Sequence, residues 1–371
     1  MLTHNKPEEP VTPKWRSLRT WILPVLVVLT WFVNVCLPYD SQFVERWYSR
    51  GIFPLFRQSW DWTFGFSPVP LLYALLLLIG FMLIRSVVRS TGRWGKLWSC
   101  LRSLTLIFCA LYVLFYWTWG FNYKRADVKN RLPVMTVDID EELIFNEYLR
   151  VTDSLIQLRN NITDVSKEWD AHQLEQQVRH DLVAWFDEIE LPSTGKVRVR
   201  ALRPSGSLLV ISTAGVYLPF VGEGHIDGGL HPITYPFTMM HEMTHGYGWT
   251  GEDVCNFFAL MGTIRSQNPR IRYSGYMGYW RYLRANAFRT NKVRFRDMDE
   301  CLDPRIKSDY RDIFAYTDRY PDIMPRLRDL IYDQYLKSHG IADGIVSYSA
   351  IVKLALAWQQ SHGSLLTSPD N

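Results

Sequence analysis

A chain of 371 residues exceeds the usual size of a single domain, so we expect more than one structural unit. Its 41 Lys and Arg against 37 Asp and Glu give a net charge of only +4, and no basic and aromatic stripe indicates a nucleic-acid-binding protein. The five cysteines form no CxxC pair, which argues against a cysteine-rich metal site or a disulfide framework. Cys255 and Cys301 leave open either one disulfide or two unlinked thiols.

Three uncharged apolar stretches dominate the first third of the chain. They run from Thr20 to Tyr39, from Phe64 to Ile84 and from Ser103 to Phe121. Each has the roughly 20 residues that an α-helix needs to cross about 30 Å of hydrocarbon. Tryptophan and tyrosine gather towards their ends, as they do at membrane surfaces. The sequence therefore predicts a membrane domain over residues 20–121, with three transmembrane helices and the lipid bilayer as partner.

The basic residues beside these stretches predict an orientation. Those before the first stretch and between the second and third are Lys6, Lys14, Arg16, Arg19, Arg85, Arg89, Arg93, Lys96 and Arg102. Because basic loops favour the cytoplasm, residues 1–19 are expected there, and three spans then place the C-terminal domain outside. A second basic group after the third stretch opposes this orientation, but long domains translocate largely regardless of charge. That group is Lys124, Arg125, Lys129 and Arg131.

Residues 122–360 are predicted to form a mostly helical α+β domain with a small sheet. Apolar residues at helical spacing predict two helices between Asp138 and Ile189. Short strands are expected at Val197–Val199 and Leu208–Ser212, with a further extended run over Ala214–Phe220. The Gly-rich stretch Val221–Tyr235 is expected to be a loop.

The rest of the domain is predicted to be helical. The expected helices are one that contains Pro236 in its first turn, then Glu252–Ser266, Asp309–Thr317, Pro325–Ser338 and Ser347–Gln360. The last residues, 361–371, are expected to be a disordered tail.

The run HEMTH within the Pro236 helix carries the chemistry. Residues four apart share a helix face, so His241 and His245 can present two ring nitrogens to one tetrahedral Zn²⁺. Glu242 then lies beside the open coordination position, where it can act as the catalytic base towards a zinc-activated water. The pattern predicts metal-assisted hydrolysis.

A zinc site of this type needs a third protein ligand. The short turn Gly246–Gly251 returns the chain into a helix that begins with Glu252 and Asp253. We expect Glu252 to bind the metal, because Thr250 and Asp253 have the spacing of a capping box. Asn256, one turn further along, is expected to hold the ligating carboxylate. A plain acidic residue that complements the helix dipole is the alternative role for Glu252, with Asp253 or Glu223 as the alternative ligands.

Four segments resemble a known family of bacterial membrane proteins, domain of unknown function 3810, and the resemblance covers nearly the whole chain. They are GVYLPFVGEGHIDGG (Gly215 to Gly229), YPFTMMHEMTHGYGWTGEDVCNFFA (Tyr235 to Ala259), RYSGYMGYWRYL (Arg272 to Leu283) and YLKSHGIADGIVSYS (Tyr335 to Ser349). The HELAH-like core of that family is similar to the motifs of gluzincin-type zinc metallopeptidases. The resemblance implies ligand roles for His241, His245 and Glu252, a base role for Glu242, and a location in the bacterial inner membrane.

The sequence departs from the family pattern at two places. Val254 and Cys255 stand where relatives tend to have a second Glu and then Ala, which removes one candidate ligand and favours Glu252. Asp227 stands where an Asn is usual, and we assign it no role.

Other polar residues near the motif are weaker candidates. Glu223, His225 and His231 can border the cleft or serve only as loop residues. Leu209–Phe220 can supply an edge strand that pairs with an extended substrate, or simply be core. Tyr273, Tyr276, Tyr335 and Tyr348 are candidate donors to an oxyanion, although packing explains most tyrosines. His172 and His180 are expected to bind no metal.

Two hypotheses for the function follow. The first is a membrane-anchored zinc metallopeptidase that acts on envelope proteins or peptides. The second is a catalytically silent anchor or sensor with a structural zinc site. Glu242 favours the enzyme, because a structural site needs no base beside the metal and closes its fourth position with protein. A non-peptide hydrolase would share the same metal chemistry.

Overall fold

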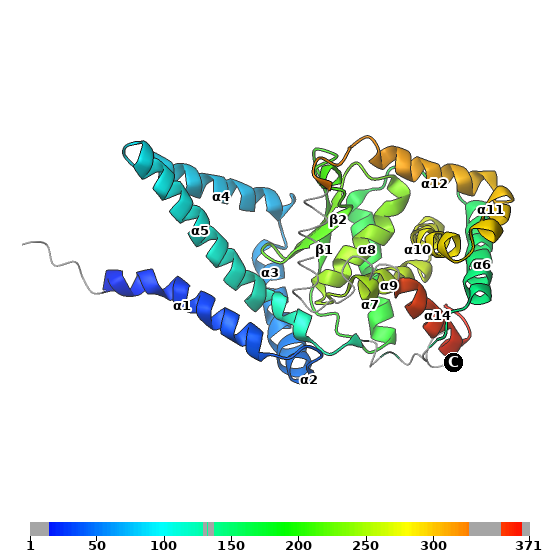
Figure 1. Cartoon of the computed structure of the whole chain (residues 1–371), viewed down its shortest axis with the longest axis horizontal. Helices are drawn as coiled ribbons and strands as arrows, with labels where there is room; N and C mark the ends of the chain where they lie inside the picture. Colours follow the sequence, from blue (N-terminus) through cyan, green and yellow to red (C-terminus); the bar gives the residue numbers. More distant parts are fainter. Residues whose placement is uncertain (1–14, 129–131, 133–136, 326–349, 366–371) are drawn as a thin grey trace, which may run out of the picture.

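A computed structural model describes residues 15–128, 132, 137–325 and 350–365 of the chain. Three long helices, α1 (Trp15–Cys36), α4 (Leu71–Val88) and α5 (Arg93–Thr118), project away from a compact C-terminal part (Figure 1). The shorter helices α2 (Gln42–Val44), η1 (Glu45–Ile52) and α3 (Phe53–Phe64) lie at the junction, and the single turn η2 (Gly120–Lys124) follows α5.

Among the described residues, two helices, α4 and α5, are long and apolar enough to cross a membrane, by length and composition alone. They form an antiparallel hairpin (Figure 1). A cluster of serine hydroxyls joins them, with Ser86 Oγ 2.5 Å from Ser99 Oγ and 2.7 Å from Ser103 Oγ. Among the residues of α4 none is buried, so its apolar surface faces outwards.

Three membrane spans were expected, but only two of the described helices are long and apolar enough to be spans. The first expected span, Thr20–Tyr39, falls on α1, whose apolar part Trp21–Cys36 is shorter, and the helix ends before Pro38 because a residue that precedes proline avoids the helical region. The second, Phe64–Ile84, begins too early, since Pro68 and Pro70 separate α3 from α4. The third, Ser103–Phe121, lies mostly within α5, which starts at Arg93 and ends at Thr118.

The C-terminal part is mostly helical, as predicted. The two early helices are α6 (Glu141–Arg159) and α7 (Ala171–Glu188), and the pair that carries the motif is α8 (Tyr235–Gly246) and α9 (Glu252–Ile264). The family segment RYSGYMGYWRYL lies in α10 (Pro269–Thr290), a long helix against α6 and α9. The remaining helices are α11 (Lys292–Glu300), α12 (Pro304–Thr317) and α14 (Ala350–His362), and the single turns are η4 (Leu209–Ile211) and η5 (Pro232–Thr234).

The end of the chain differs from the expected tail. Helix α14 runs to His362, past the expected end of the last helix at Gln360, and the Leu365 side chain is fully buried while its carbonyl accepts a bond from Arg265. Residues 366–371 and the expected helix Pro325–Ser338, apart from Pro325, lie outside the described residues.

A three-stranded mixed sheet lies beside α8 (Figure 1). Its order is β1 (Arg198–Leu202), β3 (Glu223–Asp227) and β2 (Gly215–Leu218), with β3 parallel to β1 and antiparallel to β2. Two expectations fail here. The expected strand Leu208–Ser212 contains the turn η4, and the expected loop Val221–Tyr235 contains the central strand. The sequence EGHID of β3 lacks apolar alternation, yet all five of its residues are buried.

The two acidic residues of β3 are buried with polar partners around them. The Glu223 carboxylate contacts the guanidinium groups of Arg198 and Arg200 and accepts a bond from the backbone N–H of Leu71, the first residue of α4. The Asp227 carboxylate accepts backbone N–H bonds from four residues: Gly206, Leu208, Leu209 and Gly229. Ion pairs and hydrogen bonds from backbone N–H groups thus replace the apolar contacts that a central strand ordinarily makes.

The sheet approaches the end of α8 closely at Gly246. A Cβ added at Gly246, the last residue of α8, would lie 2.2 Å from Val197 Cγ1 and 3.1 Å from the Tyr217 ring. We therefore expect Gly246→Ala to lower the free energy of unfolding by roughly 1–3 kcal/mol, the usual cost of overpacking. Gly80→Ala is the matched control, since a Cβ at Gly80 meets nothing within 4 Å. Denaturant unfolding of both variants in one detergent measures the difference, and equal stabilities would contradict the close approach.

Candidate metal centre

Helix α8 places both histidines of the motif on one face. The helix begins after Thr234 with a proline in its first turn, where the missing N–H costs nothing. It ends at Gly246, and Gly248 follows with φ of +88°, a left-handed conformation that favours glycine. The backbone N–H of Trp249 then bonds back to the carbonyl of Thr244. This tight turn sends the chain directly into α9.

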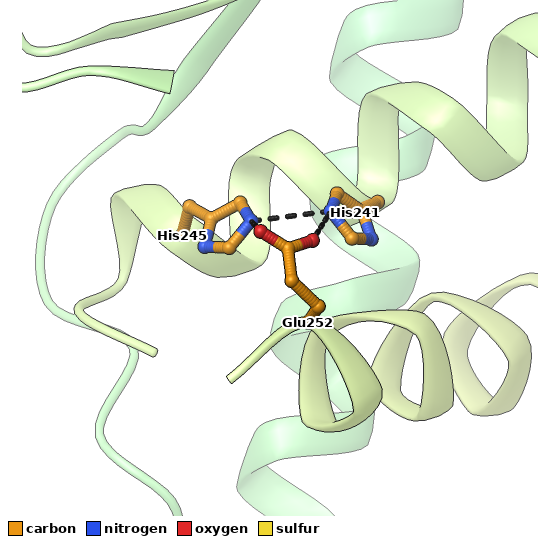
Figure 2. A group of neighbouring side chains, drawn as sticks. All are labelled: His241, His245 and Glu252. Atoms are coloured by element: carbon orange, nitrogen blue, oxygen red, sulfur yellow. Dashed lines mark hydrogen bonds and ion pairs between the residues drawn. The ribbon is translucent and has the colours of Figure 1, made fainter. Parts of the chain in front are cut away.

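Three side chains converge between α8 and α9 (Figure 2). The Nε2 atoms of His241 and His245 lie 3.1 Å apart. The Glu252 carboxylate, from the first residue of α9, lies 3.2 Å from His241 Nε2 and 3.7 Å from His245 Nε2. The three side chains are about nine-tenths buried, and one ligand atom from each lies within 4.8 Å of the others, so the group could hold a metal ion.

The second nitrogen of each ring has its own acceptor. His241 Nδ1 lies 3.0 Å from Asn256 Oδ1, and His245 Nδ1 lies 2.8 Å from the carbonyl oxygen of Trp249. Because these oxygens accept and do not donate, each Nδ1 carries the ring proton. Each Nε2 then directs a lone pair to the point where the rings and Glu252 meet, as a metal ligand requires.

The charges around this point attract a cation. Burial alone would raise the pKa of Glu252, but His245 and His241 lower it well below its usual range, so the carboxylate is ionised. Burial alone would lower the pKa of His245, but Cys255 and Glu252 raise it well above its ordinary value. Burial raises the pKa of the Cys255 thiol to about 11, so Glu252 supplies the negative charge at pH 7. A proton or a metal cation between the two Nε2 atoms and the Glu252 carboxylate would remove the repulsion between their lone pairs.

Glu242 lies beside this group and is 4% exposed. Burial raises its pKa to about 7, against the lowering effect of His241 and His245. Two strands approach its side chain closely: an added Cβ would lie 2.6 Å from Glu242 Oε1 at Gly215 and 2.8 Å from Glu242 Cβ at Gly224. Glycine at both strand positions leaves room for the carboxyl group, which can therefore exchange a proton near neutral pH.

The alternative third ligands lie elsewhere. The Asp253 side chain folds back over the start of α9, where a Cβ at Gly251 would lie 3.0 Å from its Oδ1. The helix begins after Gly251 without a side-chain cap, so the expected capping box from Thr250 is absent. Glu223 belongs to the arginine cluster of the sheet. Of the three acidic residues considered from the sequence, the structure brings only Glu252 to the histidines.

The remaining sequence candidates have other surroundings. His231 accepts the N–H of Ile233 at the start of η5, and its Nε2 lies 3.0 Å from Ser166 Oγ. His225 is fully buried in β3, and burial lowers its pKa to about 4. Tyr273 donates to Asp309 Oδ2. Tyr276 is buried in the core of the C-terminal part.

The other residues considered from the sequence add no ligand. His172 is exposed and lies 3.3 Å from Gln176, and His180 is absent from the cluster that could hold a metal within the described residues. Tyr335 and Tyr348 lie outside the described residues. Cys255 is buried and Cys301 exposed, and both are free thiols.

Sequence reasoning missed two residues and misplaced a third. Asn256 was expected behind the Glu252 carboxylate but orients His241 instead. Trp249 contributes a backbone carbonyl, which no side-chain motif reveals. Tyr282 of α10 lies near the group: burial raises its pKa to about 12, and Glu252 and Asn256 also act on it. With 20 tyrosines in the chain, spacing alone gives no reason to choose this one.

These observations define a mostly helical protein with two apolar helices and a buried His–His–Glu group that could hold a metal. The chain belongs to the family described as protein of unknown function (DUF3810), whose model matches residues 48–356. The matched region contains both apolar helices and the whole candidate site. Comparisons with curated proteins and with solved structures found no match.

Metal content tests the centre directly. We expect the purified chain to bind about one divalent transition-metal ion, because two histidines and a carboxylate form a high-affinity set. His241→Ala removes one of three ligands and should reduce the bound metal to background. His172→Ala removes an exposed histidine on α7 and is the matched control. Elemental analysis after dialysis provides the measurement, and equal metal content in the two variants would contradict the site.

Proposed function

We propose that this protein is a membrane-anchored, zinc-dependent metallopeptidase. The observation that carries the proposal is the convergence of His241, His245 and Glu252 with the buried acid Glu242 beside them. A binding site for a structural ion has no use for a base with a pKa near 7. The family match and the comparisons name no activity, so the proposal depends on the chemistry of these side chains.

The three ligand groups fit zinc. Atoms bonded to a tetrahedral zinc ion at about 2.0–2.2 Å lie about 3.3 Å from one another. The two Nε2 atoms here lie 3.1 Å apart, and the Glu252 carboxylate has one oxygen 3.2 Å from His241 Nε2 and the other 3.7 Å from His245 Nε2. Two histidine nitrogens and one glutamate oxygen form the donor set of catalytic zinc sites, which keep the fourth position for water or substrate. Within the described residues only these three groups converge, as an open site requires.

The chain supplies proton transfer beside that position. Bound zinc would polarise the scissile carbonyl and lower the pKa of a water molecule. The Glu242 carboxylate accepts a proton as the water oxygen adds to the carbonyl carbon, and the same proton passes to the amine nitrogen as the C–N bond breaks. Burial raises the pKa of Glu242 above that of an ordinary carboxyl group, which makes it a better proton acceptor.

Strand β2 offers a way to hold a peptide. It is an edge strand in the described sheet, and Asp227 N bonds to Ala214 O in register with the pair Val216 and His225. Because alternate residues of an antiparallel strand bond to the partner, the backbone groups of Gly215 and Tyr217 point away from β3. An extended peptide could pair with this edge beside Glu242, which favours a peptide substrate over a small ester or amide.

Loss of the base should separate binding from turnover. Glu242→Gln keeps the size of the side chain but cannot accept the proton, so turnover should fall by about 10²–10⁴-fold while zinc stays bound. Comparison of envelope proteomes in cells that carry either form should reveal uncleaved substrates with the variant. Glu300→Gln, at an exposed position in α11, is the control. Full turnover by Glu242→Gln would contradict the proposed mechanism, whereas identical proteomes would favour the silent anchor or a non-peptide substrate.

We also propose that α4 and α5 anchor the protein in the inner membrane, with the C-terminal domain outside the cytoplasm. The tip of the α4–α5 hairpin lies far from that domain (Figure 1). The hairpin carries the exposed basic residues Arg85, Arg89, Arg93, Lys96 and Arg102 at or near this tip. Basic groups of this kind favour the cytoplasm, so the domain at the other end of the hairpin lies on the far side.

Two of the basic residues that opposed this orientation have interaction partners within the protein. Arg125 is buried and paired with Glu45. Lys124 is also buried, with its Nζ 3.4 Å from the centre of the Tyr39 ring. Their charges are therefore used in the fold and do not serve as a signal for the cytoplasm. Lys129 and Arg131 lie outside the described residues.

Reporter fusions test the orientation. Alkaline phosphatase fused after Asn371 should be active, because that enzyme folds only outside the cytoplasm. The same phosphatase inserted between Val88 and Arg93 should be inactive, while a fluorescent protein there should fold. Reversal of both results would overturn the orientation and place the substrates in the cytoplasm.

A further inference from the structure

We propose that the end of the membrane anchor is part of the metal centre, with Trp119 and Arg125 acting as positioning residues for the ligand His245. The inference rests on the proposed function, because it assigns these residues a role towards bound zinc. Both lie outside the motif, 126 and 120 residues before His245 in the chain.

Trp119 follows α5 directly and reaches the end of α8. Its indole N–H donates to the carbonyl oxygen of His245 at 2.7 Å, in a buried environment. The same carbonyl accepts the N–H of Gly248 at 2.9 Å, so one backbone atom joins the ligand, the turn and the anchor. The Trp119 ring also packs against Tyr217 of β2, with ring centres 5.8 Å apart.

Arg125 holds the turn that follows His245. Its guanidinium donates to the Gly248 carbonyl at 2.8 Å and lies over the Trp249 ring, 3.6 Å from the ring centre. Trp249 is the residue whose carbonyl accepts the Nδ1 proton of His245. The guanidinium therefore contacts both Trp249, whose carbonyl orients the ligand ring, and Gly248, the residue before it.

Glu45 of η1 holds Arg125 in turn. Its two carboxylate oxygens accept bonds from Arg125 Nε at 2.8 Å and from Nη2 at 3.0 Å, a bidentate pair. The Glu45 side chain is 1% exposed, and Arg125 is 5% exposed. Since buried bidentate pairs have a single favourable geometry, the junction beneath the membrane helices determines where the turn lies.

The consequence is that the zinc affinity of His245 depends on the docked anchor. Without these contacts the turn can shift, the Trp249 carbonyl leaves Nδ1, and the His245 ring can rotate away from Glu252. Loss of a contact that orients a metal ligand typically costs about 10–100-fold in metal affinity. A turn held only by its own backbone bonds would show no such dependence.

Zinc affinity of the full chain in detergent tests the inference, by competition with a chromophoric chelator. Trp119→Phe keeps an aromatic ring but removes the indole donor to His245, and should weaken zinc binding by about 10–100-fold. Trp117→Phe is the matched control. It removes an indole donor two residues earlier, which bonds to Thr30 Oγ1 of α1 at 2.9 Å, far from the motif. That variant should bind zinc like the unmodified chain.

Arg125→Lys provides a second variant, because an ammonium keeps a charge for Glu45 but cannot bind it at two points, reach Gly248 and stack on Trp249. Arg159→Lys is its control, since Arg159 also joins a carboxylate, Asp309, to a backbone carbonyl, that of Ile162. Thermal unfolding of the four metal-free variants reports any general loss of stability. The visible spectrum of bound Co²⁺ reports the ligand geometry.

The outcomes separate the two proposals. Weaker zinc binding and an altered Co²⁺ spectrum in Trp119→Phe and Arg125→Lys, with unchanged controls, support the positioning role. Zinc affinity equal to that of the unmodified chain in both variants, or equal losses in the controls, overturns it and leaves the peptidase proposal intact. Failure of the unmodified chain to bind zinc overturns both.

Discussion

The candidate site depends on one constraint: three electron-rich groups must meet in a buried place. Two histidine nitrogens 3.1 Å apart and an ionised carboxylate repel one another unless positive charge lies between them. The surrounding structure holds them there, since Asn256 and the Trp249 carbonyl orient the rings and the short turn after α8 delivers Glu252. The centre is organised for a cation by bonds that the cation itself does not make.

The junction with the apolar helices lies close to this centre. Arg57 of α3 donates to the Gly222 carbonyl, the N–H of Leu71 in α4 bonds to Glu223 of β3, and Trp119 after α5 bonds to His245. The sheet and the motif helix thus share polar contacts with the segments that carry the proposed anchor. Under the proposed function, a site so close to the apolar helices suits substrates presented at a bilayer surface, such as envelope proteins and peptides.

Local patterns predicted the helices and the triad well, and the strands poorly. The spacing of His241 and His245 follows from helix geometry, and the turn of glycines before Glu252 is short enough to limit where its carboxylate can go. Strand β3 was missed because burial of Glu223, His225 and Asp227 contradicts any pattern based on hydrophobicity. The polar partners of Glu223 and Asp227 come from Arg198, Arg200, Leu71 and the segment around Gly206, all distant in the chain.

The sequence by itself determined which residue types meet on one helix face and which segments are apolar enough for a bilayer, because both depend on neighbours within a few turns. Only the tertiary structure decided which groups orient and surround the ligands. Asn256 pairs with His241, the strands reach Glu242 through glycines, and Trp119 and Arg125 contact the turn. These contacts join residues up to 126 positions apart, and a distance of that size leaves no periodic trace in the chain.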